Sequence, residues 1–163
     1  MISPPRITER LLDSDELAGL LTEAIAGNHT ICFNAPGQSM HPFIHSGDKI
    51  FISPVTTETI RLGDILAIVC PSDDHVLVHR VVKIQKRRYF TKGDNVASSG
   101  DGWIDSGKVL GRVTRIEREG VEHQLGLGME KQLIALLSRR NYLVPVLNFY
   151  RWVKRGITGL FSS

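Results

Sequence analysis

The residues best suited to chemistry surround Ser39, in the stretch Gly37-Gln38-Ser39-Met40-His41-Pro42. A glycine two residues before the serine and a proline three residues after it are typical of a sharp turn, where a hydroxyl projects instead of packing. The apolar run at residues 49–52 follows and predicts a strand. We therefore expect Ser39 to lie at the mouth of a sheet, as a nucleophile would. A serine that only caps a turn is the alternative.

A serine nucleophile needs a base, and the chain has six histidines that could supply it. Five of them lie beside turns or polar residues, where a solvated histidine needs no explanation. His79 differs, because it stands in the β-branched segment 76–84 between Val78 and Val81. Burial there would disfavour the charged ring, and neutral imidazole is the form that a general base requires. The alternative is a core histidine bonded to a backbone carbonyl.

The third member of such a group is a carboxylate that orients the histidine. Asp94, Asp101 and Asp105 are the candidates, in the turn after residue 92 and in the loop beyond it. Spacing along the sequence does not choose among them, and an aspartate at position 94 would also suit a turn cap.

Five stretches of the chain resemble the sequence boxes of type I signal peptidases, in the same order. They are Gly37-Gln38-Ser39-Met40-His41-Pro42, Gly47-Asp48, Gly63-Asp64-Ile65, Val78-His79-Arg80-Val81 and Thr91-Lys92-Gly93-Asp94-Asn95. The resemblance covers roughly residues 37–113, and five ordered boxes match by chance far less readily than one motif does. A histidine precedes the Arg-Val pair where the bacterial branch has lysine. The chain therefore resembles the histidine branch of archaea and the endoplasmic reticulum.

This resemblance implies a mainly β (α+β) fold: an antiparallel β-barrel-like core with an N-terminal helix and C-terminal helices. It makes Ser39 the nucleophile and His79 the base, with Asp94 and Asp101 as accompanying acids. Asp101 is preferred to Asp105 as the second acid. A substrate peptide would add as an extended strand beside the serine box, with small side chains just before the cut. The cleft and the oxyanion site would be lined by Pro36, Gly37, Gln38 and Met40.

The resemblance also predicts how the tetrahedral intermediate is stabilised. The backbone N–H of Ser39 and a donor near Gly37 would form the oxyanion hole. Related enzymes often have a side-chain hydroxyl at the position of Gly37, and a glycine leaves only backbone donors there. One lost donor costs on the order of 100-fold or more in rate. Weaker or specialised activity is thus compatible with the sequence, and we expect neither a cofactor nor a metal.

The elements that position these residues follow from hydrophobic periodicity. Apolar residues three and four apart predict one amphipathic helix over residues 13–26. We expect strands at residues 30–33, 51–53, 65–70, 76–84, 87–92 and 109–116, the third of them buried on both faces. The Gly-, Ser- and Asp-rich segment 96–106 predicts a long surface loop. The chain divides into an N-terminal helical segment (1–28), a β catalytic domain (29–125) and a helical tail (126–163).

Composition limits the class of protein. The 163 residues, 42% of them hydrophobic, are enough for one domain with a real core. Cys32 and Cys70 have neither CxxC nor metal spacing. We expect both to be small, buried, apolar side chains that stay reduced in a reducing compartment. The N-terminus lacks the apolar run of a secretory signal or anchor, and no apolar run reaches the roughly 20 residues that span a bilayer. We expect a cytoplasmic protein, peripheral to a membrane at most.

The helical tail is basic and aromatic. Residues 130–163 hold six Lys and Arg against the single acid Glu130, a net charge of +5. Since the whole chain has a net charge of +3, residues 1–129 have a net charge of −2. Basic helices with interleaved aromatic residues can lie in a membrane surface. Charge alone also suits nucleic acid, but we expect a membrane surface and no nucleic acid as partner. Packing of the tail against the β-body is the alternative.

Two other functions are compatible with the same core. A self-cleaving regulator of the LexA type would cut its own linker, and Ala26-Gly27 resembles that dipeptide. However, Gly27 stands only 12 positions before Ser39, a lysine instead of His79 would be the base, and no helix-turn-helix domain fits in the first 30 residues. A catalytically silent peptide-binding module is the other. We therefore predict a serine endopeptidase of signal-peptidase type, acting on a peptide or preprotein.

Overall fold

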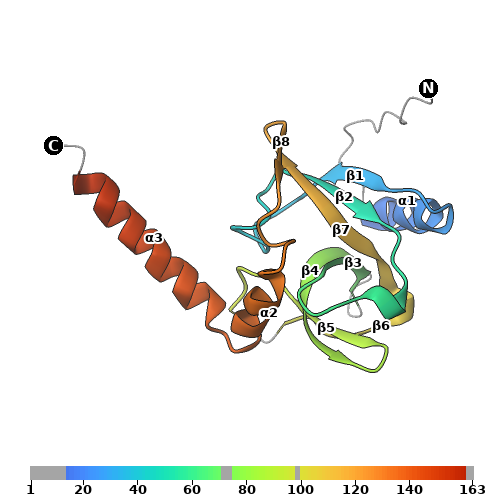
Figure 1. The fold of residues 1–163 in the computed structure, drawn as a ribbon. Helices are drawn as coiled ribbons and strands as arrows, with labels where there is room; N and C mark the ends of the chain where they lie inside the picture. Colours follow the sequence, from blue (N-terminus) through green and yellow to red (C-terminus); the bar gives the residue numbers. More distant parts are fainter. Residues whose placement is uncertain (1–13, 71–74, 98–99, 161–163) are drawn as a thin grey trace.

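The computed structural model describes residues 14–70, 75–97 and 100–160, and its centre is an antiparallel sheet of eight strands (Figure 1). The elements are α1 (Ser14–Ala26), β1 (Ile31–Asn34), β2 (Lys49–Ser53), η1 (Thr57–Thr59), β3 (Ile65–Val69), β4 (Val76–Gln85), β5 (Arg88–Lys92), β6 (Gly102–Asp105), η2 (Ser106–Lys108), β7 (Val109–Arg118), β8 (Val121–His123), α2 (Lys131–Arg139) and α3 (Leu143–Leu160). The strand order is β1-β2-β7-β3-β4-β5-β6, with β8 paired to β7.

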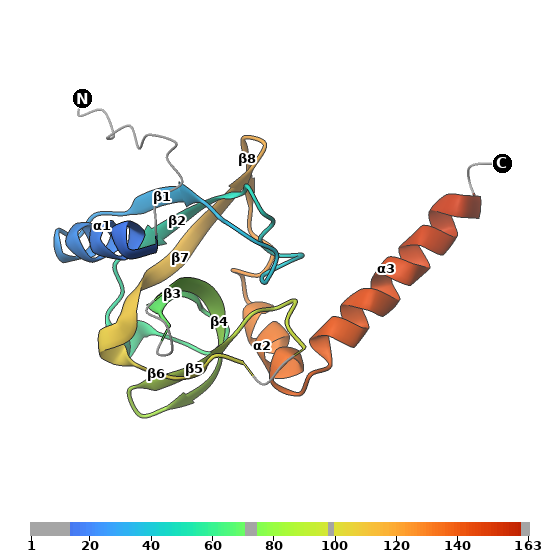
Figure 2. The ribbon, with the colours of Figure 1, turned by 180° about the vertical axis from the view of Figure 1, so that it is seen from behind.

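The sheet is strongly curved but not closed. β4 curls around in both views, while β1 and β6 stand at the two ends of the strand order (Figures 1 and 2). The predicted class is confirmed: a mainly β, antiparallel core with a helix before it and helices after it. The barrel-like core is an open, curled sheet.

Most predicted strands begin and end within two residues of the observed ones. β3 is buried at four of its five positions, as a continuous apolar run predicts. Two strands were not predicted. β8 was missed, and β6 lies inside segment 96–106, for which a surface loop was expected. β6 forms because it pairs with β5 through Phe90↔Trp103 and Tyr89↔Ile104. The neighbouring strand thus stabilises a segment whose four residues give too short a pattern to predict a strand.

Three groups of buried apolar side chains hold the elements together. The first packs Leu21 of α1 against β2 and β7, including Ile52 and Ile116. The second joins β3, β4, β5 and β6 and contains Leu66, Ile68, Val81, Tyr89 and Ile104. The third packs Phe43 against Ile134 of α2 and Leu143 of α3. Beyond this anchor α3 projects away from the sheet in both views (Figures 1 and 2).

Both cysteines are thiols, and they differ in burial. Cys70 is buried, as predicted, whereas Cys32 in β1 is only half-buried, so the prediction for Cys32 was too strong. Burial raises the pKa of the Cys32 thiol, and the charge of Lys49 counters this only in part. Cys32 therefore stays protonated near neutral pH.

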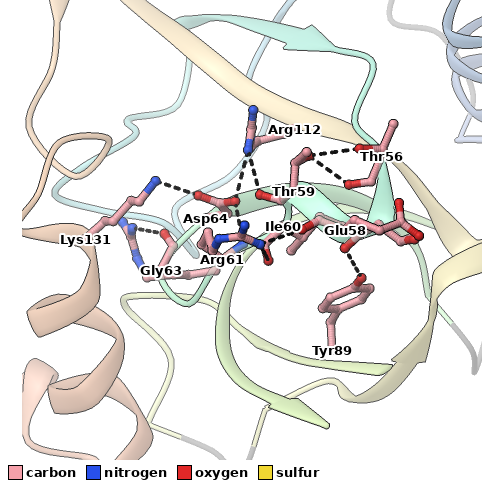
Figure 3. A network of polar contacts seen from close by, with 12 residues as sticks. Thr56, Glu58, Thr59, Ile60, Arg61, Gly63, Asp64, Tyr89, Arg112 and Lys131 are labelled. Atoms are coloured by element: carbon pink, nitrogen blue, oxygen red, sulfur yellow. Dashed lines mark hydrogen bonds and ion pairs between the residues drawn. The ribbon is translucent and has the colours of Figure 1, made fainter. Parts of the chain in front are cut away.

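A buried carboxylate, Asp64, ties the start of α2 to the sheet (Figure 3). It accepts hydrogen bonds from Lys131 Nζ at 2.7 Å, from Arg112 Nη1 at 3.3 Å and from the backbone N–H of Arg61 at 2.9 Å. Gly63 lies directly against Lys131 with φ +91°, where an added Cβ would overlap the lysine backbone. Position 63 thus requires glycine for two independent reasons.

A second buried carboxylate, Asp48, closes the turn that follows the serine stretch. It accepts hydrogen bonds from Arg118 Nη2 at 2.7 Å, from Arg118 Nε at 2.8 Å and from the backbone N–H of His45 at 2.7 Å. Burial by itself would raise the pKa of Asp48. The hydrogen bonds from Arg118 and His45 outweigh burial and leave this pKa below its usual value.

Asp48→Asn should therefore lower the free energy of unfolding by about 2 kcal/mol at neutral pH, because charge-assisted hydrogen bonds are lost. Since the folded pKa is lowered, this stabilisation is present above the unfolded pKa of about 3.9 and is lost as pH falls through the folded pKa. Urea unfolding from pH 7 to below pH 4 should show the two proteins converging. Asp105→Asn, at an exposed ion pair with Arg88, is the control with little effect. A difference that does not change with pH would contradict this account.

Candidate active site

Ser39 lies in the turn segment between β1 and β2. Gly37 has φ +76°, in the left-handed region, and the backbone N–H of His41 donates to the carbonyl of Gln38 at 3.1 Å. Met40 is buried in the core beside α1 and β2, so it anchors the turn from below. The side chain of Ser39 remains half-buried at the surface of the sheet. Glycine at position 37 allows this path because it adopts positive φ without strain.

His79 lies in β4 and connects two side chains that are distant in sequence. Its Nε2 lies 2.9 Å from Ser39 Oγ, and its Nδ1 lies 2.7 Å from Asp101 Oδ2. The residue is only 6% exposed. A carboxylate at Nδ1 favours the tautomer with the proton on that nitrogen, which leaves Nε2 free to accept the serine proton. The hydroxyl, the imidazole and the carboxylate are thus connected in the order that a nucleophile, a base and an orienting acid require.

The three candidate acids occupy different places. Asp101 lies on His79, whereas Asp94 is fully buried against Arg80 and accepts from Nε at 2.9 Å and from Nη2 at 2.7 Å. Burial raises the pKa of Asp94, and the charge and hydrogen bonds of Arg80 act in the opposite direction. Asp105 pairs with Arg88 at the surface, with 74% of its side chain exposed. The structure thus brings only Asp101, of the three, within hydrogen-bond distance of the histidine.

The turn at residues 93–95 holds the serine turn in place. The backbone N–H of Asn95 donates to Ser39 O at 2.7 Å, and Asn95 Nδ2 donates to Gln38 O at 3.3 Å. Gly93 makes this approach possible, because a Cβ there would lie 2.8 Å from Ser39 O and 3.1 Å from His79 Nε2. The sequence predicted a turn at Gly93 and Asn95 but no contact of these residues with the serine turn. The only feature of the sequence that pointed to the site was that both residues belong to the box Thr91-Lys92-Gly93-Asp94-Asn95.

A pocket of about 110 Å³ opens beside Ser39 and His79. Its other lining residues are Phe33, Ala35, Pro36, Gly37, Met40, Ile44, Val76, Leu77 and Val78. Three of the four predicted cleft residues line it. Gln38 does not line it, and instead is exposed with its carbonyl bound by Asn95. The wall from the start of β4 was missed, although it belongs to the same apolar run as His79. The pocket is mostly apolar and suits a small side chain.

Two histidines lie close together beside the serine turn. The rings of His41 and His45 stack with their centroids 4.6 Å apart, beside the serine turn. In the described parts of the chain, no group of three or more His, Cys, Asp and Glu side chains is arranged to hold a metal ion.

A serine hydroxyl bonded to a buried histidine, on a curved antiparallel sheet, is an arrangement typical of serine peptidases. Residues 8–113, more than half of the chain, match the family described as Peptidase S24-like. The chain therefore belongs to that family, and the resemblance to type I signal peptidases predicted from the sequence boxes is confirmed.

Curated relatives share part of the chain. The signal peptidase complex catalytic subunit SEC11C of Homo sapiens and that of Canis lupus familiaris are each 31% identical in an alignment 86 residues long, and the match covers 45% of this chain and 45% of the relative. The chain thus spans about half the length of the curated relatives that it matches.

The positive φ of Gly37 predicts that a side chain at this position lowers the stability of the protein. A Cβ at this position meets no atom within 4 Å, so Gly37→Ser would be penalised by its φ of +76° and not by a clash. We expect the substitution to lower the free energy of unfolding by about 1 kcal/mol, measured by urea denaturation. The matched control is Gly107→Ser, which also meets no atom but has no positive φ. Equal stability losses in the two variants would contradict this explanation.

Proposed function

We propose that this chain is a serine endopeptidase of signal-peptidase type, with residues 29–125 as its catalytic domain. The observation that carries the proposal is the double contact of His79, with Ser39 Oγ at 2.9 Å and Asp101 Oδ2 at 2.7 Å. Membership of a peptidase family supports the reaction class. The name of the relatives, catalytic subunits of a signal peptidase complex, supports a preprotein or peptide as substrate.

In the proposed mechanism, Ser39 Oγ attacks the scissile carbonyl while His79 Nε2 accepts the hydroxyl proton. Asp101 keeps the proton on Nδ1 and stabilises the imidazolium that forms. The negative oxygen of the tetrahedral intermediate would accept hydrogen bonds from the backbone N–H of Ser39 and from a donor near Gly37. The imidazolium then gives its proton to the leaving amine. Water, activated by the same histidine, hydrolyses the acyl-enzyme.

The pocket beside Ser39 supports an extended substrate with a small residue near the cut. It lies between residues 33–37, which continue β1, and residues 76–79, which begin β4. A peptide that ran along this pocket would present alternate side chains to it, as in strand addition. The volume of about 110 Å³ and the apolar lining favour a small aliphatic side chain over a large or charged one.

The role of the three residues can be tested with a fluorophosphonate probe and a library of extended peptides. Ser39→Ala should abolish labelling, and His79→Ala and Asp101→Asn should lower the cleavage rate roughly 10³- to 10⁴-fold. Asp105→Asn is the matched control, because this exposed carboxylate lies on Arg88 and should leave the rate unchanged. Labelling of Ser39→Ala at the wild-type rate would refute the proposal.

The same experiment separates the alternatives. Intact mass measurement would reveal a cut after Ala26 in a self-cleaving protein, and this cut would be missing in Ser39→Ala. A catalytically silent binding module would take up peptides without labelling or cleavage in any variant.

We further propose that residues 130–163 lie on an anionic membrane surface. Exposed apolar side chains are concentrated on the two C-terminal helices and the residues beside them: Met129, Leu133, Leu136, Tyr142, Val146, Phe149, Tyr150 and Trp152. Phe149 and Trp152 stack with their ring centroids 6.0 Å apart. The same stretch carries a net charge of +5. No helix among the described residues is long and apolar enough to cross a bilayer. An interfacial position accounts for both the aromatic and the basic residues.

Vesicle flotation tests whether residues 130–163 bind a membrane surface. The protein should bind vesicles that contain phosphatidylserine more tightly than pure phosphatidylcholine vesicles, and added salt should weaken binding. Phe149→Ser and Trp152→Ser should each weaken binding about tenfold, because each removes a large apolar side chain from the interface. Val121→Ser, an equally exposed apolar position on β8, is the control. These variants leave the packing of α2 on β4 intact, which deletion of residues 130–163 would not. Equal binding by all variants would contradict the proposal.

A further inference from the structure

Asp101 is held at both its backbone and its side chain by one residue, Thr91. The backbone N–H of Asp101 donates to Thr91 O at 3.0 Å. The hydroxyl of Thr91 donates to Asp101 Oδ2 at 2.9 Å. Thr91 lies in β5 and has no exposed surface, so its hydroxyl requires a partner within the protein. The partner is the same oxygen that lies 2.7 Å from His79 Nδ1.

Two glycines flank Asp101 and explain why it needs this attachment. Gly100 and Gly102 have φ of +99° and +98°. A Cβ at Gly100 would lie 2.8 Å from Thr91 O and 2.7 Å from the ring of Phe90, so glycine allows the chain to approach β5 at this point. Glycine also has the largest backbone freedom of any residue. Asp101 thus stands between two permissive positions, and Thr91 is the rigid element beside it.

The two donors to Oδ2 come from neighbouring strands. His79 belongs to β4 and Thr91 to β5, and the ladder between these strands places Thr91 opposite Val81, two residues after the histidine. A carboxylate oxygen can accept two hydrogen bonds, one at each lone pair. When the Thr91 hydroxyl binds one lone pair of Oδ2, the second lone pair is directed at the imidazole of His79. Without the hydroxyl, the carboxyl group of Asp101 could rotate about its side-chain bonds.

We infer that Thr91 is a positioning residue of the Ser39–His79–Asp101 group: its hydroxyl holds the Asp101 carboxylate in the orientation that accepts the hydrogen bond from the N–H at His79 Nδ1. This role rests on the proposed function, and it adds a fourth side chain to the site. Thr91 acts only through Asp101. Its loss should therefore slow the reaction without altering the affinity for a ligand at Ser39.

The test uses the full chain and the rate of fluorophosphonate labelling of Ser39, resolved into a maximal rate and an apparent dissociation constant. Thr91→Val keeps the shape and the β-branched backbone preference but removes the hydroxyl. It should lower the maximal rate about 10- to 100-fold, the loss expected for one hydrogen bond to a charged group, with the dissociation constant unchanged. Thr91→Ser restores the hydroxyl and should recover most of the rate.

A double-mutant cycle separates positioning from a structural effect. If Thr91 acts through Asp101, then Thr91→Val should have almost no further effect on the rate in the Asp101→Asn background. A structural effect would lower the rate by the same factor in both backgrounds. Urea unfolding of each variant checks the fold, and Thr91→Ala compared with Thr91→Ser is a second pair that differs in the hydroxyl if Thr91→Val is unstable.

The outcomes for the two proposals are distinct. If wild type is labelled and Ser39→Ala is not, but Thr91→Val and Thr91→Ala label as fast as wild type, the role of Thr91 is refuted and the proposed function stands. Additive effects of Thr91→Val and Asp101→Asn would refute it in the same way. If wild type and Ser39→Ala are labelled equally, the proposed function itself fails, and the role of Thr91 fails with it.

Discussion

The buried ion pair between Arg80 and Asp94 is the interaction on which the remaining structure depends. Neither side chain has exposed surface, and the guanidinium donates three hydrogen bonds to the carboxylate. Arg80 Nη1 also donates to the carbonyls of Gly63 and Gly126, both at 2.8 Å. One side chain thus joins β4 to the turn after β5, to the turn before β3 and to the segment before α2. Loss of either charge would leave the other buried and unpaired, at a cost of about 3–5 kcal/mol.

The geometry of the site follows from this pair. His79 precedes Arg80 in β4, so the position of the arginine limits where the histidine backbone can lie. Asp94 stands between Gly93, where an added Cβ would lie 3.1 Å from His79 Nε2, and Asn95, whose backbone N–H donates to Ser39 O. The ion pair therefore aligns the strand that carries the base with the turn that supports the nucleophile. Asp94, whose side-chain hydrogen bonds go to Arg80, still contributes to the site in this way.

The C-terminal helices are attached to the same region through Lys92, the residue before Gly93. Its ammonium group is buried and donates to Asn141 Oδ1 at 2.5 Å and to Ser138 O at 3.3 Å, at the end of α2. Burial lowers the pKa of Lys92. A cation at the C-terminal end of a helix is also favoured by the helix dipole. The residue next to the turn that supports Ser39 thus holds the C-terminal end of α2. The hydrogen bond between Lys131 and Asp64 holds the N-terminal end of that helix.

The sequence by itself determined the mainly β class, most strand positions and the family, because hydrophobic periodicity and ordered boxes are local signals. It singled out Ser39 and His79 by residue type, and their catalytic roles stay predictions. Only the tertiary structure decided which carboxylate reaches the histidine, since Asp94, Asp101 and Asp105 are equivalent as residue types. β6 and the contacts of Thr91 and Asn95 were likewise decided there. The physical reason is that hydrogen bonds between residues 10 to 57 positions apart in the sequence depend on the register and curl of the sheet, which no local pattern encodes.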